Sequence, residues 1–137
     1  MTTSERFIFI SHSGEDTWVA RQIAREIAAR GASPFLDEAQ IAIGEEFEDV
    51  LLKNLDKAHE LVVLITPWAL QRPYVWAELG AAWLRQIPIV VVLHGISPAE
   101  FQAQPNALVF LKKRNMISLN DIDKYLDELS ERMADHA

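Results

Sequence analysis

The absences in this sequence narrow its function before any motif is considered. The chain has no cysteine among its 137 residues, which excludes disulfides, thiolate nucleophiles and cysteine-ligated metals. It has no excess of positive charge either: the formal net charge is −7, and an acidic surface repels nucleic-acid phosphates and anionic membranes. Its apolar runs are too short to span a bilayer, and its first residues lack the pattern of a signal peptide. We therefore expect a cytoplasmic protein that binds neither nucleic acid nor membrane.

Several common site motifs are missing as well. The four histidines are scattered, without the HxxxH or HExxH spacing of metal sites, so no metal is expected. The sequence has no GxGxxG and no P-loop lysine, the fingerprints of dinucleotide-binding Rossmann folds and of NTPases. We expect neither a metal nor a resident cofactor.

What the chain does have is a large apolar fraction in an alternating pattern. Half of its residues are apolar, and its length is typical of one domain, so we expect a single domain over residues 1–137 with a core at about 6–134. Short β-favouring runs alternate with amphipathic segments. Expected strands lie at 7–10, 34–36, 61–65, 88–93 and 115–118, and expected helices at about 16–30, 47–58, 73–86 and 121–133. Single helices between strands predict an α/β fold, a flavodoxin-like doubly wound sheet of about five parallel strands flanked by helices.

Local signals place some helix ends. Ser13 and Asp16 have the spacing of a capping box, Gly31 is expected to end the first helix, and Pro73 suits a first helical turn. Asn120 or Asp121 is expected to cap the last helix, and the stretch at 98–105 is expected to be irregular.

In such sheets ligands bind beyond the carboxyl ends of the strands, where loops 11–15, 37–44 and 66–73 emerge.

Two segments at that edge are candidates for chemistry. Glu78 lies one turn after Tyr74, so the two share a helical face that can hold a cationic or planar ligand; the alternative is a solvated helix glutamate. At 11–14 a small loop precedes a helix, where free backbone N–H groups favour phosphate; the alternative is a capped turn. Ile41 and Ile43 on the second loop can mark a contact surface, or they fold back onto the domain.

Three motifs in this order resemble the TIR (Toll/interleukin-1 receptor homology) domain, especially its bacterial form. Residues 7–16 look like the family's first box, residues 35–37 and the loop through 45 resemble its second strand and BB loop, and residues 72–83 resemble its tryptophan-to-glutamate motif. The resemblance runs from about Phe7 to Met133. One departure is Tyr74, where the family usually has Trp four residues before the glutamate. The third box of animal receptors is not evident, which counts against an animal receptor.

The resemblance implies cleavage of NAD⁺ at the nicotinamide–ribose bond, with NAD⁺ as substrate. It implies Glu78 as the catalytic residue and Asp37 as a weaker candidate for substrate binding. Ser11, His12 and Ser13 would line the nucleotide pocket, and Tyr74 would pack against a ring. A carboxylate suits this chemistry because the bond breaks with positive charge developing on the ribose.

The resemblance also implies assembly with other TIR copies, head to tail, in antiviral or stress signalling. Ile41, Ile43 and Gly44 would face the partner copy, and a sensor domain would lie in the same or another chain. A heterologous contact of this kind builds filaments rather than closed dimers.

Two further functions stay open at this stage. One is a non-catalytic module that recruits another TIR protein. The other is a nucleoside deoxyribosyltransferase-like enzyme, which has a similar architecture and also uses a glutamate at a glycosidic carbon. A phosphoacceptor receiver domain fits less well, since it needs acidic residues just after the first strand, where residues 11–13 stand. Whether the product is linear or cyclic ADP-ribose is not fixed by the residues.

Overall fold

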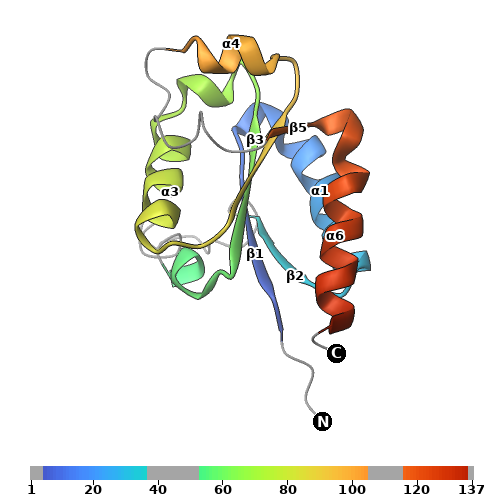
Figure 1. The fold of residues 1–137 in the computed structure, drawn as a ribbon. Helices are drawn as coiled ribbons and strands as arrows, with labels where there is room; N and C mark the ends of the chain where they lie inside the picture. Colours follow the sequence, from blue (N-terminus) through green and yellow to red (C-terminus); the bar gives the residue numbers. More distant parts are fainter. Residues whose placement is uncertain (1–4, 37–52, 105–115, 136–137) are drawn as a thin grey trace.

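The fold is a five-stranded parallel sheet between two layers of helices (Figure 1). The computed structural model describes residues 5–36, 53–104 and 116–135, so Asp37, Ile41, Ile43 and Gly44 lie outside the described residues. The strand order is β2-β1-β3-β4-β5 and every pair is parallel. The strands are β1 (Phe7–Ser11), β2 (Ser33–Leu36), β3 (Glu60–Ile65), β4 (Ile89–Leu93) and β5 (Met116–Ser118). This order confirms the predicted flavodoxin-like sheet.

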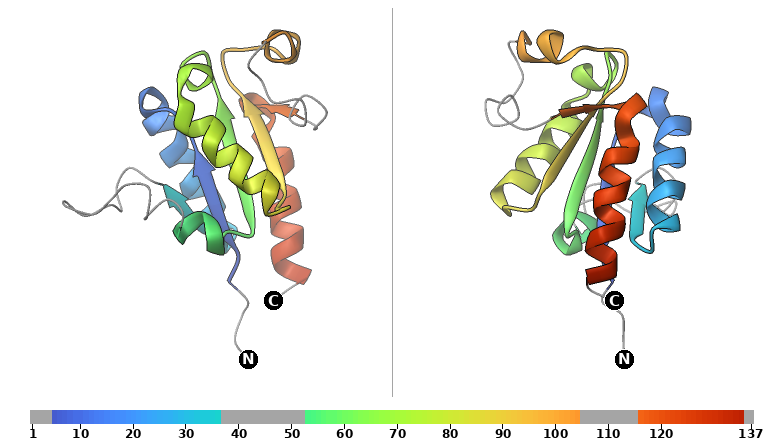
Figure 2. Two further views of the ribbon diagram at one scale, coloured as in Figure 1. Left: turned by 90° about the vertical axis from the view of Figure 1, so that its left-hand side faces the viewer. Right: turned by 45° about the vertical axis from the view of Figure 1, so that its right-hand side comes forward.

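Helices cover both faces of the sheet. Helix α3 (Pro73–Leu84) lies on one face, and α1 (Thr17–Ala29) and α6 (Ile122–Asp135) lie together on the other (Figure 2). A short α4 (Pro98–Gln102) follows β4 beyond the carboxyl ends of the strands. Residues 53–57 are also helical. Three 3₁₀ turns precede longer helices: Gly14–Asp16, Ala69–Gln71 and Leu119–Asp121.

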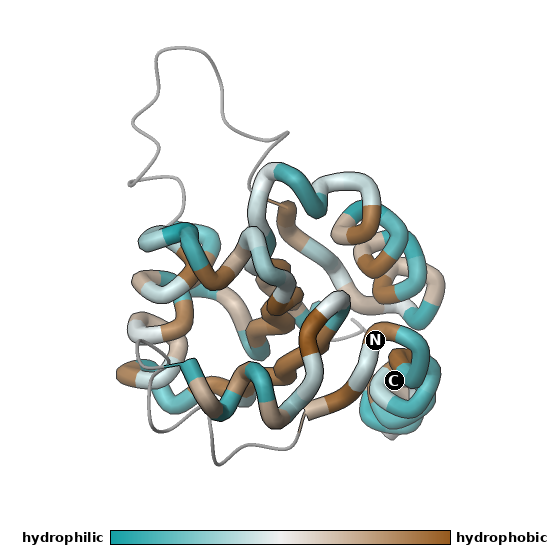
Figure 3. Tube along the Cα trace, turned by 90° about the horizontal axis from the view of Figure 1, so that it is seen from above, coloured by the Kyte–Doolittle hydropathy of each residue, from teal (hydrophilic) through white to brown (hydrophobic). Residues whose placement is uncertain are grey.

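Each face of the sheet has its own apolar core. Because successive strand residues point to opposite faces, Phe9 packs towards α3 with Val63 and Leu79, whereas Ile10 packs towards α1 and α6. All six residues of β3 are buried, as its unbroken apolar run predicted for a strand covered on both sides. Seen from above, the strands in the centre are mostly hydrophobic, whereas hydrophobic and hydrophilic residues alternate along the helices around them (Figure 3).

A buried ionic cluster closes the amino-terminal end of β3. The side chain of Glu60 is 1% exposed and pairs with Arg6 at 2.7 Å. Arg132 of α6 lies 3.4 Å from the same carboxylate, and the Tyr125 hydroxyl donates a hydrogen bond to it. The cluster joins β3 to the residue before β1 and to α6, far from the carboxyl edge of the sheet.

Several local predictions are confirmed and others are wrong. Helix α3 begins at Pro73 as predicted, and α1 ends before Gly31, which has a φ of +93°. The capping box at Ser13 is wrong, because its hydroxyl donates to the Asp16 carboxylate at 2.6 Å rather than accepting from a backbone N–H.

The carboxyl-terminal half contains one further correction. The stretch predicted to be irregular contains α4, whose start has a complete capping box between Ser97 and Glu100. The 3₁₀ turn before α6 has its own cap, Ser118, whose hydroxyl accepts the Asn120 backbone N–H at 3.2 Å; the cap of α6 itself at Asn120 or Asp121 stays a prediction. Among the described residues, no helix has the length and apolarity needed to cross a membrane.

Candidate functional site

The strand order fixes where a ligand site belongs. The chain leaves β1 for β2 on one side and leaves β3 for β4 on the other, so the order reverses between the neighbours β1 and β3. In doubly wound sheets the crevice at such a switch point, beyond the carboxyl ends of the strands, is the usual ligand site. The loop after β1 and the loop before α3 both begin there.

Glu78 and Ser11 meet at this point. Ser11 ends β1 and shares a sheet face with Phe9, which packs in the α3-side core, so its side chain points towards α3. Its hydroxyl donates a 2.8 Å hydrogen bond to Oε1 of Glu78. Ser11 is fully buried and Glu78 is 5% exposed. The predicted catalytic residue is therefore a buried carboxylate oriented by a hydroxyl 67 positions away in the sequence.

Tyr74 makes the neighbouring contact. It lies one turn before Glu78 on α3, and its hydroxyl donates to the backbone carbonyl of His12 at 3.0 Å. The helical face predicted to carry Tyr74 and Glu78 together therefore faces the end of β1. The His12 side chain is 2% exposed, and the residues that the structure describes offer its Nδ1 no hydrogen-bond partner.

A second buried carboxylate lies just after the loop that follows β1. Asp16 is 4% exposed and accepts hydrogen bonds from the Ser13 and Thr66 hydroxyls, at 2.6 and 2.5 Å. Thr66 also accepts the Ala69 backbone N–H at 3.1 Å. Asp16 thus fixes the loop after β1 to the loop after β3. Sequence reasoning assigned Asp16 only to capping and missed Thr66, although a polar residue that ends an apolar strand at the switch point is a usable signal.

An exposed ion pair links the same two loops. Nη2 of Arg72 lies 2.5 Å from Oε1 of Glu15, with side chains 38% and 43% exposed. The hydrogen bond from Arg72 lowers the pKa of Glu15, and Glu15 in turn raises the pKa of Arg72. Arg72 is also the N-cap residue of α3, so a cation stands at the edge of the site.

The structure brings five predicted site residues together and leaves one outside its description. Ser11, His12, Ser13, Tyr74 and Glu78 converge on the switch point, whereas Asp37 lies outside the described residues. Within the described ranges no group of three His, Asp or Glu residues is placed to hold a metal ion.

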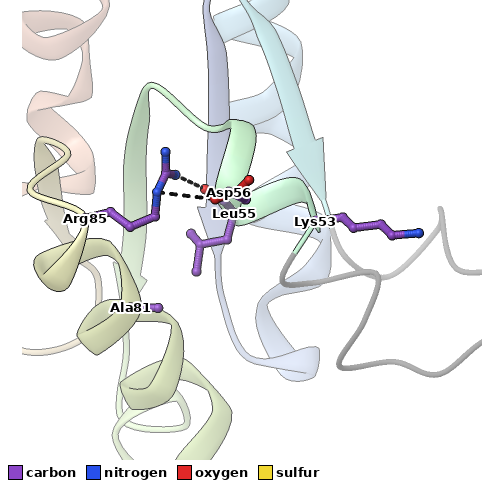
Figure 4. A pocket seen from close by; sticks show the side chains of 5 residues that line it. All are labelled: Lys53, Leu55, Asp56, Ala81 and Arg85. Carbon is purple, nitrogen blue, oxygen red and sulfur yellow. Dashed lines mark hydrogen bonds and ion pairs between the residues drawn. The ribbon is translucent and has the colours of Figure 1, made fainter.

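An open hollow lies beyond the site along α3 (Figure 4). It has a volume of about 340 Å³, and its described lining is Lys53, Leu55, Asp56, Ala81 and Arg85. Arg85 crosses it, donating to the Leu55 carbonyl and lying 3.8 Å from Asp56. None of the predicted site residues is among this lining, so we do not assign the hollow to the site.

These features define a doubly wound α/β domain with a buried carboxylate at its switch point. The family model for the TIR domain matches residues 8–133, and the chain belongs to this family. No curated protein matches the chain in sequence.

Solved TIR structures share the fold. The TIR domain of the Toll-related receptor TRR-2 from Hydra magnipapillata is 14% identical with a TM-score of 0.70, over 93% of this chain and 97% of that one. The TIR domains of the activated Roq1 resistosome, which recognises the pathogen effector XopQ, are 19% identical with a TM-score of 0.63, over 96% and 85%. A TIR-STING receptor from C. gigas, solved with 2′,3′-cGAMP, is 23% identical with a TM-score of 0.69; the match covers 92% of this chain and 38% of that one.

Proposed function

We propose that this chain cleaves NAD⁺ at the nicotinamide–ribose bond, as a glycohydrolase or a cyclase, with Glu78 as the catalytic residue. The observation that carries the proposal is the buried Glu78 carboxylate, held by Ser11 at 2.8 Å at the switch point of a TIR domain. Buried carboxylates need a compensating partner or a function, and this one stands where doubly wound sheets bind ligands.

The chemistry needs one fixed negative charge. The bond from ribose C1′ to the nicotinamide nitrogen breaks with its electron pair going to the nitrogen, so nicotinamide leaves neutral. Positive charge develops on C1′ and the ring oxygen, as in glycoside cleavage. A carboxylate already oriented by Ser11 stabilises that charge without reorganising. Water then bonds to C1′ and releases a proton in the hydrolase, whereas an adenine nitrogen bonds to C1′ in the cyclase.

The surrounding residues supply binding groups of the right kinds. Tyr74 offers an aromatic ring one turn from Glu78, which suits packing against a nicotinamide or adenine ring. His12 and Ser13 lie in the loop at the end of β1, close to the Tyr74 hydroxyl and to Asp16. We assign these residues and Ser11 to the nucleotide pocket, with Asp37 as a further candidate.

Self-assembly is part of the proposal. Glu78 is only 5% exposed in the single chain, so substrate access requires a change at this edge, which a neighbouring copy can supply. Ile41, Ile43 and Gly44 would face that copy in a head-to-tail contact, which propagates rather than closes. The protein would then act in the cytoplasm, in antiviral or stress signalling, under a sensor domain of the same or another chain.

The test removes the carboxylate, keeping the shape of the side chain in one variant and truncating it in the other. Glu78→Gln and Glu78→Ala are compared with the wild type for nicotinamide release, read by chromatography across protein concentrations. Glu26→Gln is the matched control, since Glu26 is an exposed glutamate of α1. We expect both Glu78 variants to lose turnover and the Glu26→Gln control to keep it. Full turnover by a folded Glu78 variant would refute the assignment, and the same chromatograms distinguish linear from cyclic ADP-ribose.

A second candidate function is a TIR module that binds another TIR protein without catalysis. Trp18 and Trp68 favour it: they are 69% and 51% exposed, and exposed aromatic side chains are characteristic of protein interfaces. Loss of NAD⁺ in concentrated wild-type protein would exclude binding as the sole function. No loss at any concentration would leave this candidate as the better one.

A further inference from the structure

The contacts between α3 and the end of β1 follow a regular order. Glu78 meets Ser11, Tyr74 meets the His12 carbonyl, and Arg72 meets Glu15. As the chain proceeds from the end of β1 to residue 15, its partners lie progressively closer to the start of α3. This is the order expected for a helix antiparallel to the strand it covers. Residues four apart on a helix are separated by about 6 Å along its axis, so the first two contacts are adjacent steps of one interface.

We propose, on the basis of the function proposed above, that Tyr74 is a positioning residue. Its hydroxyl holds the His12 carbonyl against α3 and thereby keeps Ser11 aligned with the catalytic Glu78. Tyr74 then has two separate roles, because its ring packs against the substrate while its hydroxyl acts through the loop. The second role depends on tyrosine, since the tryptophan usual in the family has no hydroxyl to place on that carbonyl.

The alternatives for holding this loop are weaker or lie elsewhere. The pair between Arg72 and Glu15 is exposed to solvent, and exposed ion pairs constrain little. Asp16 fixes the loop further on, through Ser13 and Thr66. The Tyr74 hydroxyl makes its contact one residue from Ser11, in a half-buried position. Pairing with Val63 already sets the sheet face on which the Ser11 side chain lies, and the Tyr74 contact on the next residue is the one best placed to hold that side chain at its distance from Glu78.

The experiment is a double-mutant cycle read by steady-state kinetics. Tyr74→Phe removes the hydroxyl and keeps the ring, so kcat is expected to fall roughly five-fold, the equivalent of one hydrogen bond, while KM stays within about two-fold because ring packing is retained. Ser11→Ala is expected to lower kcat by about ten-fold or more. If Tyr74 acts through Ser11, the double variant is no slower than Ser11→Ala alone. Multiplied effects, or an unchanged kcat in Tyr74→Phe, would overturn the proposal.

A matched control distinguishes the effect of Tyr74→Phe from a loss of stability, and a second readout tests the contact without relying on the proposed reaction. Tyr125→Phe makes the same change in the chain's other tyrosine, at the opposite end of the sheet, and should leave kcat unchanged. Amide hydrogen exchange of residues 12–16 should become faster in Tyr74→Phe relative to the amides of β3, whereas in Tyr125→Phe both sets should change alike, by the loss of global stability. A wild type that releases no nicotinamide contradicts the proposed function, and exchange still decides the contact: unchanged protection in Tyr74→Phe contradicts the role of the hydroxyl.

Discussion

The buried cluster at Glu60 makes the stability of this protein depend on pH in the alkaline range. Burial raises the pKa of Tyr125 above its ordinary value of 10.0, and the Glu60 carboxylate raises it further through its charge and the hydrogen bond it accepts. Arg132 and Arg6 oppose that shift without cancelling it. The folded state therefore favours the neutral phenol, whereas the unfolded chain ionises it near pH 10. The contribution is fully present below pH 10 and is lost as the pH rises above it.

The perturbation is Tyr125→Phe, which keeps the buried ring and removes the titrating group. At pH 8 the variant is expected to be less stable by about 1.5–3 kcal/mol, the range for a hydrogen bond to a charged group. At pH 11, one unit above the unfolded-state pKa, wild-type stability has dropped by about 1.4 kcal/mol through this group alone. The stability gap between wild type and variant should narrow by that amount.

Urea denaturation followed by far-ultraviolet circular dichroism at pH 8 and pH 11 measures the gap. Lysine titration affects both proteins alike and cancels in the difference. Leu129→Ala is the control: Leu129 is fully buried one turn further along α6, and its loss of about 2–5 kcal/mol should be the same at both pH values. A Tyr125→Phe gap that stays constant or widens at pH 11 would show that the phenol does not titrate as the cluster requires.

Other predictions concern single contacts, each measured by urea denaturation. Gly31→Ala should destabilise by about 1–2 kcal/mol because its φ of +93° strains any side chain, whereas Gly80→Ala, with open space in α3, should stabilise by about 0.5–1 kcal/mol; equal effects would contradict the backbone argument. Thr66→Val should cost about 1–3 kcal/mol, since the Ala69 N–H and Asp16 both lose a partner; a neutral result would contradict the role of Asp16. The exposed ion pair of Glu15 and Arg72 should stabilise the fold only at low salt and at pH values above the lowered pKa of Glu15. A loss of stability in Arg72→Ala that persists in 1 M salt would show that Arg72 does not act through this ion pair.

The sheet was predictable from sequence because its signals are local and repeated. The apolar runs at residues 61–65 and 88–93 match β3 and β4 almost to the residue, and single helices between strands require parallel pairing. Pro73 marked the start of α3 correctly for the same reason, since its fixed φ acts on its own residue. Helix α4 was missed because its five residues are too few to show a period, although the capping-box spacing of Ser97 and Glu100 was present.

The site was only partly predictable, because its hydrogen bonds are not local. Glu78, Tyr74 and the loop from Ser11 to Ser13 were placed at the correct edge by strand order and by the family motif. Their hydrogen-bond partners were not predicted. Ser11 and Glu78, like Thr66 and Asp16, are far apart in the sequence, and only the order of the strands brings them into contact. The sequence showed that Ser13 is near a helix start, but whether its hydroxyl binds a backbone N–H or Asp16 depends on where Thr66 stands.

The separation of these contacts along the chain has a consequence for folding. The four links across the site join residues 50, 57, 62 and 67 positions apart. Contacts between residues so far apart in the sequence form late in folding, because burial of the core must first offset the entropy lost in closing long loops. No fragment that lacks either β1 or α3 can assemble the site, because three of the four links join the end of β1, or the loop after it, to α3 or its N-cap residue. Any truncation that removes one of these two elements should therefore abolish activity, whatever the rest of the chain retains.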